Sequence, residues 1–286
     1  MSETRTEGGD TQRAYNVEIF LMSFAALLLE ISYTRVVSFK LFYYYTYLVI
    51  GLALLGIGTG GVLVAISRRM RTASTDTILM WGLLLGAASV GVGYLVVALT
   101  PVDTLEIWDY GTLSSLTNLV GLVVMCLALF ASFIAVGVMI ATLFGRRSEQ
   151  INQLYFADLV GAGLACALVV PFLSTIGPPA SIGLAGLILA LPGLRLAYRR
   201  RATPLVTAGA VVAAALALIV VAPGILPDPR GDGAKAELQD RDVVFSSWSP
   251  IFRVDAVDVG DDVRLLYHDG LAGSAIYKWD GDPASL

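Results

Sequence analysis

Apolar and polar positions follow one another along this chain in long blocks, not in the short periods of a soluble helix or strand. Seven blocks are almost wholly apolar and cover residues near 17–38, 44–67, 77–99, 114–144, 152–175, 180–197 and 203–224. Most of them reach the ~20 residues with which an α-helix crosses the hydrocarbon core of a bilayer. A segment in lipid must satisfy its own backbone hydrogen bonds, so the pattern predicts an all-α polytopic membrane bundle of about seven transmembrane helices.

Two blocks depart from an ordinary span. The block at 180–197 is short and contains Pro192, which makes it the weakest of the seven. The block at 114–144 is longer than one crossing requires, and we expect it to tilt or to extend into water. Together the blocks define a transmembrane domain over 15–224, and the acidic, Gly- and Thr-rich segment 1–14 before it is expected to be disordered.

A different pattern begins after residue 224. Residues 225–246 are mostly polar and predict a linker. Apolar and polar residues then largely alternate, as in half-buried strands, over 251–259, 263–268 and 274–279, with turn signals between them, one of which is Asp269-Gly270. Three strands are marginal by themselves, so we expect residues 247–286 to form a small antiparallel β-meander that is incomplete.

Composition agrees with a membrane protein and excludes several other classes. The chain of 286 residues is 56% hydrophobic and 15% charged, whereas soluble domains carry about 25% charged residues. With a net charge of −4 and no basic patch interleaved with aromatic residues, nothing indicates nucleic-acid binding. Cys126 and Cys166 lie inside apolar blocks and lack disulfide or metal-site spacing, so we predict no metal and no cofactor.

Candidate catalytic groups are also few. His268 is the only histidine in the sequence, and we interpret it as a surface turn residue because no nucleophile or metal ligand accompanies it. The acids Asp255, Asp258, Asp261 and Asp262 are interpreted as a solvated face of the meander. We therefore predict no catalytic residue in this chain.

Basic residues predict the orientation of the bundle. The loops that follow the second, fourth and sixth blocks hold nine arginines, and the opposite loops hold only Lys40; the nine are Arg68, Arg69, Arg71, Arg146, Arg147, Arg195, Arg199, Arg200 and Arg201. We expect an integral cell-membrane protein whose N-terminus is cytoplasmic. Seven crossings would then place the tail after residue 224 outside the cytoplasm.

Three charged residues inside apolar blocks are the main candidate site. Glu30 and Arg35 are five residues apart, so on a helix their side chains point ~140° away from each other. Each would cost about 2.5–3.5 kcal/mol at mid-bilayer, so we expect both to face the interior of the bundle. We predict a polar network in which Arg35 pairs with Asp158 and Glu30 bonds to neighbouring hydroxyls or another helix. The alternative for Arg35 is that it snorkels to the interface.

Glycines in the apolar blocks are expected to serve helix packing. Gly56 and Gly60 form a GxxxG pattern, which lets two helix backbones approach closely. Gly161 and Gly163 suggest the same role for the fifth block. The Gly-rich stretch 54–63 superficially resembles a dinucleotide loop, but it lies inside a membrane span, where such a loop has no strand-to-turn context.

Three segments resemble a known family. ALLLEISYTRVVSF (26–39) and NQLYFADLVGAGLACALVVPFL (152–173) resemble helices of membrane-bound spermidine synthase-like proteins. The tail from Trp248 to Asp282 is similar to the small N-terminal β-region of aminopropyltransferases, where a Ser-Pro-aromatic-Arg strand leads to a Leu-x-x-Asp-Gly turn. Only Asp269 and Gly270 carry over from that pattern, as β-turn residues.

The resemblance implies a Rossmann-like catalytic domain that uses decarboxylated S-adenosylmethionine, and its Gly-Gly-Gly-Asp-Gly loop does not occur in this sequence. We therefore expect a membrane module of a spermidine synthase-like protein, not catalytic by itself, whose catalytic domain is missing or separately encoded. One alternative is a transporter or export module for a small cation such as a polyamine, with Glu30 and Asp158 as its acids. Another is a structural membrane anchor.

Overall fold

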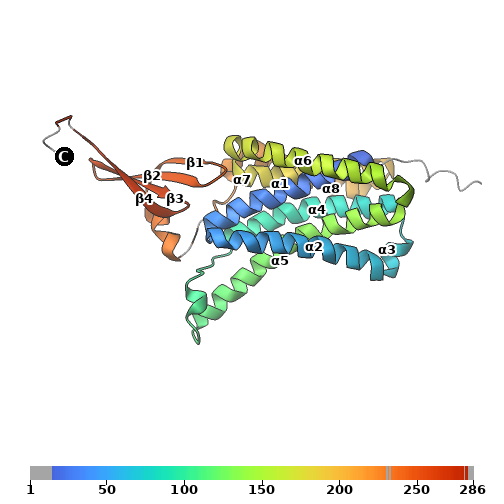
Figure 1. Ribbon diagram of the computed structural model, residues 1–286, viewed down its shortest axis with the longest axis horizontal. Helices are drawn as coiled ribbons and strands as arrows, with labels where there is room; N and C mark the ends of the chain where they lie inside the picture. The colour runs from blue at the N-terminus through green and yellow to red at the C-terminus, as the bar shows by residue number, and fades with distance from the viewer. Residues whose placement is uncertain (1–14, 230, 232, 280, 283–286) are drawn as a thin grey trace, which may run out of the picture.

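The computed structural model describes residues 15–229, 231, 233–279 and 281–282. Segment 1–14, for which disorder is expected, lies outside this range. The described chain forms a bundle of long helices followed by a small antiparallel sheet, so the predicted fold class is confirmed (Figure 1). The sheet lies beyond one end of the bundle.

Within the described residues, seven helices are long and apolar enough to span a membrane. They are α1 (Asn16–Lys40), α2 (Thr46–Ile66), α4 (Thr75–Leu99), α5 (Leu113–Arg146), α6 (Ile151–Thr175), α7 (Gly177–Arg199) and α8 (Thr203–Val221). The short helix α3 (Arg68–Thr72) joins α2 to α4, and the 3-10 turns are η1 (Tyr43–Tyr45), η2 (Glu106–Trp108), η3 (Ser148–Gln150), η4 (Pro223–Ile225) and η5 (Gly233–Asp240).

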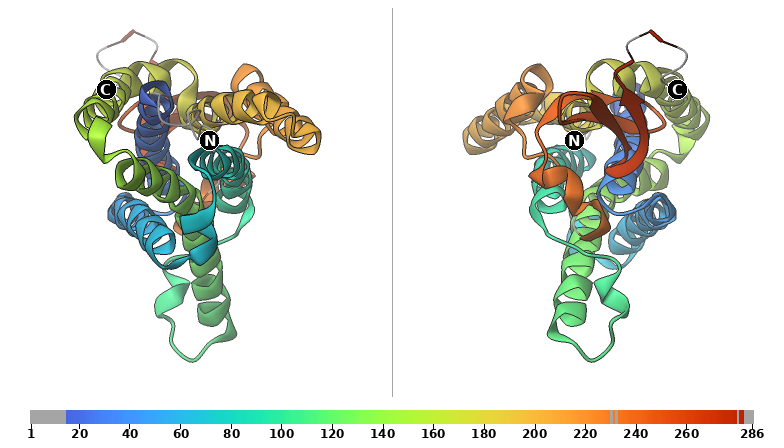
Figure 2. Two further views of the ribbon diagram at one scale, coloured as in Figure 1. Left: turned by 90° about the vertical axis from the view of Figure 1, so that its right-hand side faces the viewer. Right: turned by 90° about the vertical axis from the view of Figure 1, so that its left-hand side faces the viewer.

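Helices α1, α4 and α7 form the centre of the bundle, and the other spans surround them (Figure 2). Helix α1 packs against α6, α7 and α2, while α4 packs against α5 and α7. The two least apolar spans, α1 and α7, are also the two most buried. A helix shielded from lipid by its neighbours needs fewer large apolar side chains, which accounts for the lower hydropathy of these two spans.

Prolines explain the bounds of α7. Pro178 and Pro179 occupy its first turn, where a missing N–H removes no helical hydrogen bond, so the helix begins earlier than the predicted block. Pro192 lies inside the helix and does not end it. Helix α5 has 34 residues, or about 51 Å at 1.5 Å per residue, and its first turns project from the bundle as the sequence predicts (Figure 1).

The sheet is a four-stranded meander with strand order β1-β2-β3-β4, all pairs antiparallel. Its strands are β1 (Val243–Trp248), β2 (Arg253–Val259), β3 (Val263–His268) and β4 (Leu271–Tyr277). The sequence predicted three of them. Strand β1 was missed and begins inside the expected linker, which also contains η5.

Glycines set the closest helix contacts. A Cβ at Gly56 would lie 2.7 Å from Cβ of Phe133, and Gly60 lies against the backbone of Val138, so α2 and α5 touch through this pair. Gly161 lies against the carbonyl of Phe20 on α1. Gly163 differs from the expectation: it is exposed, with nothing within 4 Å of an added Cβ. Two residues on a helix span about 200°, so Gly161 and Gly163 lie on opposite faces.

We predict that Gly60→Ala lowers the stability of the bundle by about 1–3 kcal/mol, because the added methyl meets backbone that cannot move aside. Gly163→Ala is the matched control and should leave the melting temperature in detergent unchanged or slightly raised, since alanine favours helix over glycine. Equal destabilisation by both variants would contradict this packing.

Candidate functional site

The charged residues predicted inside the membrane lie at different depths. Arg35 is buried near the sheet end of α1, and its Nη2 lies 3.0 Å from Oδ1 of Asp269 in the sheet. Asp158 accepts a hydrogen bond from the Ser23 hydroxyl. Ser23 and Arg35 are twelve residues apart, or about 18 Å along α1. The expected pair between Arg35 and Asp158 is therefore wrong, and the pairing partner of Arg35 comes from the sheet.

Glu30 lies between these two points on α1 and is half-buried. Among the described residues, no hydrogen bond or ion pair holds its carboxylate. The structure thus does not join Glu30, Arg35 and Asp158 into one network. It places them at three separate levels of the bundle.

Asp269 links the sheet to α1. With Gly270 it forms the two-residue turn between β3 and β4, and both residues have positive φ, 49° and 81°. This is the backbone of a type I′ turn, which Asp-Gly favours. Its Oδ1 accepts from the backbone N–H of Arg253 at 2.8 Å as well as from Arg35. The turn therefore presents one carboxylate oxygen to the strand and to the helix at once.

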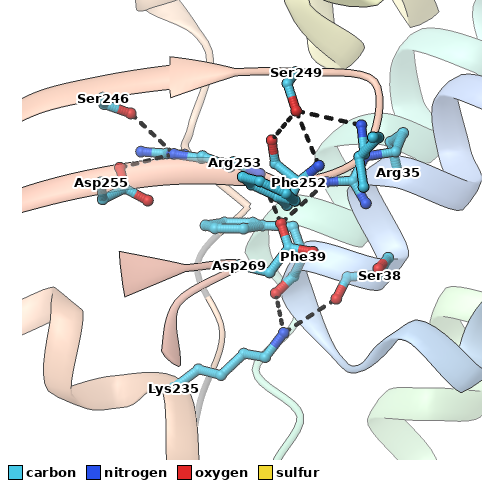
Figure 3. Close-up of polar contacts among 11 residues, drawn as sticks. Arg35, Ser38, Phe39, Lys235, Ser246, Ser249, Phe252, Arg253, Asp255 and Asp269 are labelled. Carbon is cyan, nitrogen blue, oxygen red and sulfur yellow. Dashed lines mark hydrogen bonds and ion pairs between the residues drawn. The ribbon is translucent and has the colours of Figure 1, made fainter. Parts of the chain in front are cut away.

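Lys235 caps the end of α1 (Figure 3). Its Nζ donates to the carbonyls of Ser38 at 3.1 Å and Phe39 at 2.7 Å, which lie in the last turn of the helix. Those carbonyls have no partner within the helix and carry its negative dipole end, so a cation there is favourable. Lys40 does the same for α4, donating to the carbonyl of Ala98 at 3.1 Å.

Burial changes the acidity of Lys235. The side chain is 4% exposed, and desolvation lowers its pKa to about 8. The charge of Asp269 opposes this shift, and that of Arg35 adds to it. The folded protein therefore releases this proton at a lower pH than an exposed lysine would.

Arg253 connects the first two strands with the end of α1. Its guanidinium lies over the rings of Phe39 and Trp248, at 4.8 and 5.2 Å from their centres. It is paired with Asp228 at 2.5 Å and with Asp255 at 2.9 Å. A cation stacked on two aromatic faces and held by two carboxylates fixes β2 against the helix.

Asp255 corrects the expected solvated acidic face. It is 0% exposed, and burial raises its pKa against the lowering effect of Arg253. Asp258 is exposed and paired with Arg264 at 2.6 Å. The two acids are three residues apart, so they lie on opposite faces of the strand.

The remaining space at this junction is small. A cavity of about 60 Å³ is lined by residues that include Asp228, Lys235, Arg241 and Arg253. It has room for water but falls far below the ~300–1,000 Å³ of ligand pockets. No group of three or more His, Cys, Asp or Glu side chains among the described residues could hold a metal. The arrangement is suited to holding the sheet on the bundle.

His268 and Ser249 of the tail make contacts that support the structure of the sheet. His268 stacks on Phe252 with ring centres 5.0 Å apart, next to the turn. Ser249 closes the connection between β1 and β2, accepting from the N–H of Phe252 at 3.0 Å.

The sequence did not identify Lys235, Arg253 and Asp228 as site residues. For Arg253 a signal existed, because it belongs to the Ser-Pro-aromatic-Arg pattern noted above. Lys235 and Asp228 lie in the polar segment expected to be a linker, where no periodicity marks them. Comparisons of the chain with protein-family models, with curated proteins and with solved structures find no match.

We predict that Arg35 is energetically coupled to Asp269. Asp269→Asn keeps the turn and the acceptor for Arg253 but removes the charge, since Asn-Gly also favours a type I′ turn. In a double-mutant cycle with Arg35→Gln, the coupling measured by unfolding in detergent should be about 1–3 kcal/mol. The control cycle of Arg35→Gln with Asp158→Asn should be additive. Coupling to Asp158 in place of Asp269 would contradict the assignment.

The lowered pKa of Lys235 predicts a pH dependence. Between about pH 8 and pH 10.5 the unfolded chain holds this proton and the folded chain does not, so the Lys235 contribution to stability rises with pH. Comparing wild type with Lys235→Met from pH 7.5 to 9.5 isolates that contribution. The difference in melting temperature should shift in favour of wild type as pH rises, and a flat difference would contradict burial of the amine.

Proposed function

We propose that this chain is the membrane module of a spermidine synthase-like protein, in which seven spans hold a β-region in a fixed position at the membrane surface. The seven apolar helices fit a multi-pass membrane module. The docking of the sheet is the observation that carries the proposal. A tether could hold a domain through a flexible linker alone, whereas here Arg35, Lys235 and Arg253 join helix to sheet through buried contacts.

Except for Lys235, the residues that make these contacts belong to the segments that carry the family resemblance. Arg35 lies in the helix segment 26–39, and Arg253 and Asp269 lie in the tail that is similar to the β-region of aminopropyltransferases. This coincidence supports a shared role for the two segments. It favours a module that orients a catalytic domain over a simple anchor.

The free surface of the sheet supports a further domain as partner. Large apolar side chains stay exposed on its edge strands and after them, and they include Phe245, Ile276, Tyr277 and Trp279. Large apolar side chains exposed on the edge strands of a sheet are candidates for contact with a further domain. We propose that a separately encoded aminopropyltransferase-like catalytic domain covers them.

The orientation of the module is part of the proposal. Contacts between loops bring the predicted basic loops to one end of the bundle, here called the basic end: Asp76 accepts from Tyr15 at 2.8 Å and pairs with Arg200 at 3.4 Å, and Arg147 lies over the Tyr15 ring. The sheet lies at the opposite end (Figure 1). By the positive-inside rule we propose that the basic end faces the cytoplasm and the sheet lies outside.

A second candidate is a carrier for a small cation such as a polyamine. The half-buried Glu30 favours it, because an ionisable group inside a span without a partner among the described residues is costly and is a functional candidate by default. Flux of labelled spermidine into proteoliposomes that is lost in Glu30→Gln would favour this function over the module.

Labelling with a membrane-impermeant thiol reagent tests the orientation. In a Cys126→Ala, Cys166→Ala background, we expect Ser274→Cys to react in intact cells. Ser148→Cys, which is exposed at the basic end, should react only after permeabilisation. The reverse pattern would place the sheet in the cytoplasm.

Site-specific photocrosslinking tests the module itself. A photoreactive residue at Ile276, which is 55% exposed on β4, should capture a polypeptide with aminopropyltransferase activity. The same group at Val62, which is 57% exposed on α2, is the control and should capture lipid only. Absence of such a partner at Ile276, or aminopropyl transfer by the purified chain alone, would contradict the proposal.

A further inference from the structure

A groove of about 680 Å³ runs along the outside of the bundle between α2 and α4. Both helices pack along α5 but contact each other little, so a strip of α5 forms the floor between them. Ala131 and Ala135 of that strip have small side chains, which leaves room between the two flanking helices. Trp81 and Leu85 of α4 form one wall and remain about half exposed.

The length of the groove matches one leaflet of a bilayer. Its lining on α4 extends from Thr77 to Ser89, which is about 18 Å at 1.5 Å per residue. Half of a hydrocarbon core of ~30 Å is about 15 Å. The groove starts at the basic end and ends near the middle of the span, so its dimensions suit an acyl chain of the leaflet on that side.

The mouth of the groove is positively charged. Arg69 of α3 lines it, and Arg68 and Arg71 are exposed on the same short helix. Among the described residues, none of the three forms an ion pair, and Asp76, the acid nearest in sequence, is paired with Arg200.

Helix α3 is held in place by α5. Arg146 donates to the carbonyl of Ala73 at 2.6 Å and to the carbonyls of Met70 and Arg71. Viewed from the basic end, α3 crosses from α2 toward α4 (Figure 2, left). Arg69 is thus held at the mouth by a fixed corner of the chain, and Arg68 and Arg71 add positive charge on the same short helix.

We propose that this groove binds an anionic phospholipid, with one acyl chain along α5 and the phosphate at the arginines of α3. Burial of an acyl chain would let the groove bind phospholipids with any headgroup. The cationic mouth adds a preference for headgroups of net negative charge. A hydrophobic partner helix would fill the walls but leave the arginines without counter-charge. The proposal does not depend on the function proposed for the sheet.

Fluorescence quenching of Trp81 tests the site in the full chain reconstituted in nanodiscs. The probes are phosphatidylglycerol and phosphatidylcholine carrying bromine on the acyl chain, each diluted into unlabelled phosphatidylcholine. The Trp81→Phe variant gives the background of the other tryptophans. Brominated phosphatidylglycerol should quench Trp81 well above its mole fraction, and brominated phosphatidylcholine should quench in proportion to it.

Two variants with matched controls make the result decisive. Arg69→Gln should lower the preference for phosphatidylglycerol about fivefold, the factor that corresponds to about 1 kcal/mol per basic residue near a membrane surface. Arg199→Gln, exposed at the same end but away from the groove, should leave it unchanged. Ala131→Phe fills the groove and should abolish the excess quenching, whereas Ala214→Phe on the exposed face of α8 should not.

Three results would overturn the proposal. One is proportional quenching by both lipids in wild type. Another is an equal effect of Arg199→Gln and Arg69→Gln, which would show only general surface charge. The last is a dimer in nanodiscs that Ala131→Phe dissociates, which would show that a second copy of the chain covers the groove.

Discussion

The ends of the central helices must find hydrogen-bond donors at the edge of the hydrocarbon core, and the rest of this structure depends on how they do so. The last carbonyls of α1 accept from Lys235, a residue almost two hundred positions further along the chain. Unsatisfied carbonyls at that depth cost several kcal/mol each. The segment after the last span is thereby drawn back onto the first helix, and the sheet that follows it is placed over the end of the bundle.

The cost of a buried polar group without a partner also explains where polar residues occur inside the bundle. Helix α1 is among the most buried spans, and its neighbours bury Arg35 and Lys40, whereas Glu30 stays half-buried. Arg35 adds a charge near the sheet end, and Asp269 supplies the opposite charge from a turn whose backbone requires Asp-Gly or a close equivalent. The Arg35–Asp269 pair therefore depends both on the Asp-Gly turn and on the need of a buried arginine for an opposite charge. This combination holds the sheet against the end of α1.

Much of the fold could be predicted from sequence because block length and apolar composition are sufficient to locate spans in lipid. Strands β2 and β3 were visible in their alternation, but VVFSSW of β1 directly follows a polar segment and lacks that period. The partner of Arg35 could not be predicted, since a sequence gives no depth of one helix relative to another. The helical period alone predicts that Gly161 and Gly163 lie on opposite faces of their helix. The role of Lys235 was not, because it depends on a tertiary contact made from a 3-10 segment.

The most direct test of the central claim is the distribution of distances between the sheet and the bundle. Spin labels at Ser274 on β4 and Leu54 on α2, both exposed, would report it by pulsed electron resonance in nanodiscs. The account predicts one narrow distribution that broadens in Lys235→Met combined with Asp269→Asn. A wild-type distribution about 20 Å wide, as a flexible linker of residues 227–242 would produce, would contradict it.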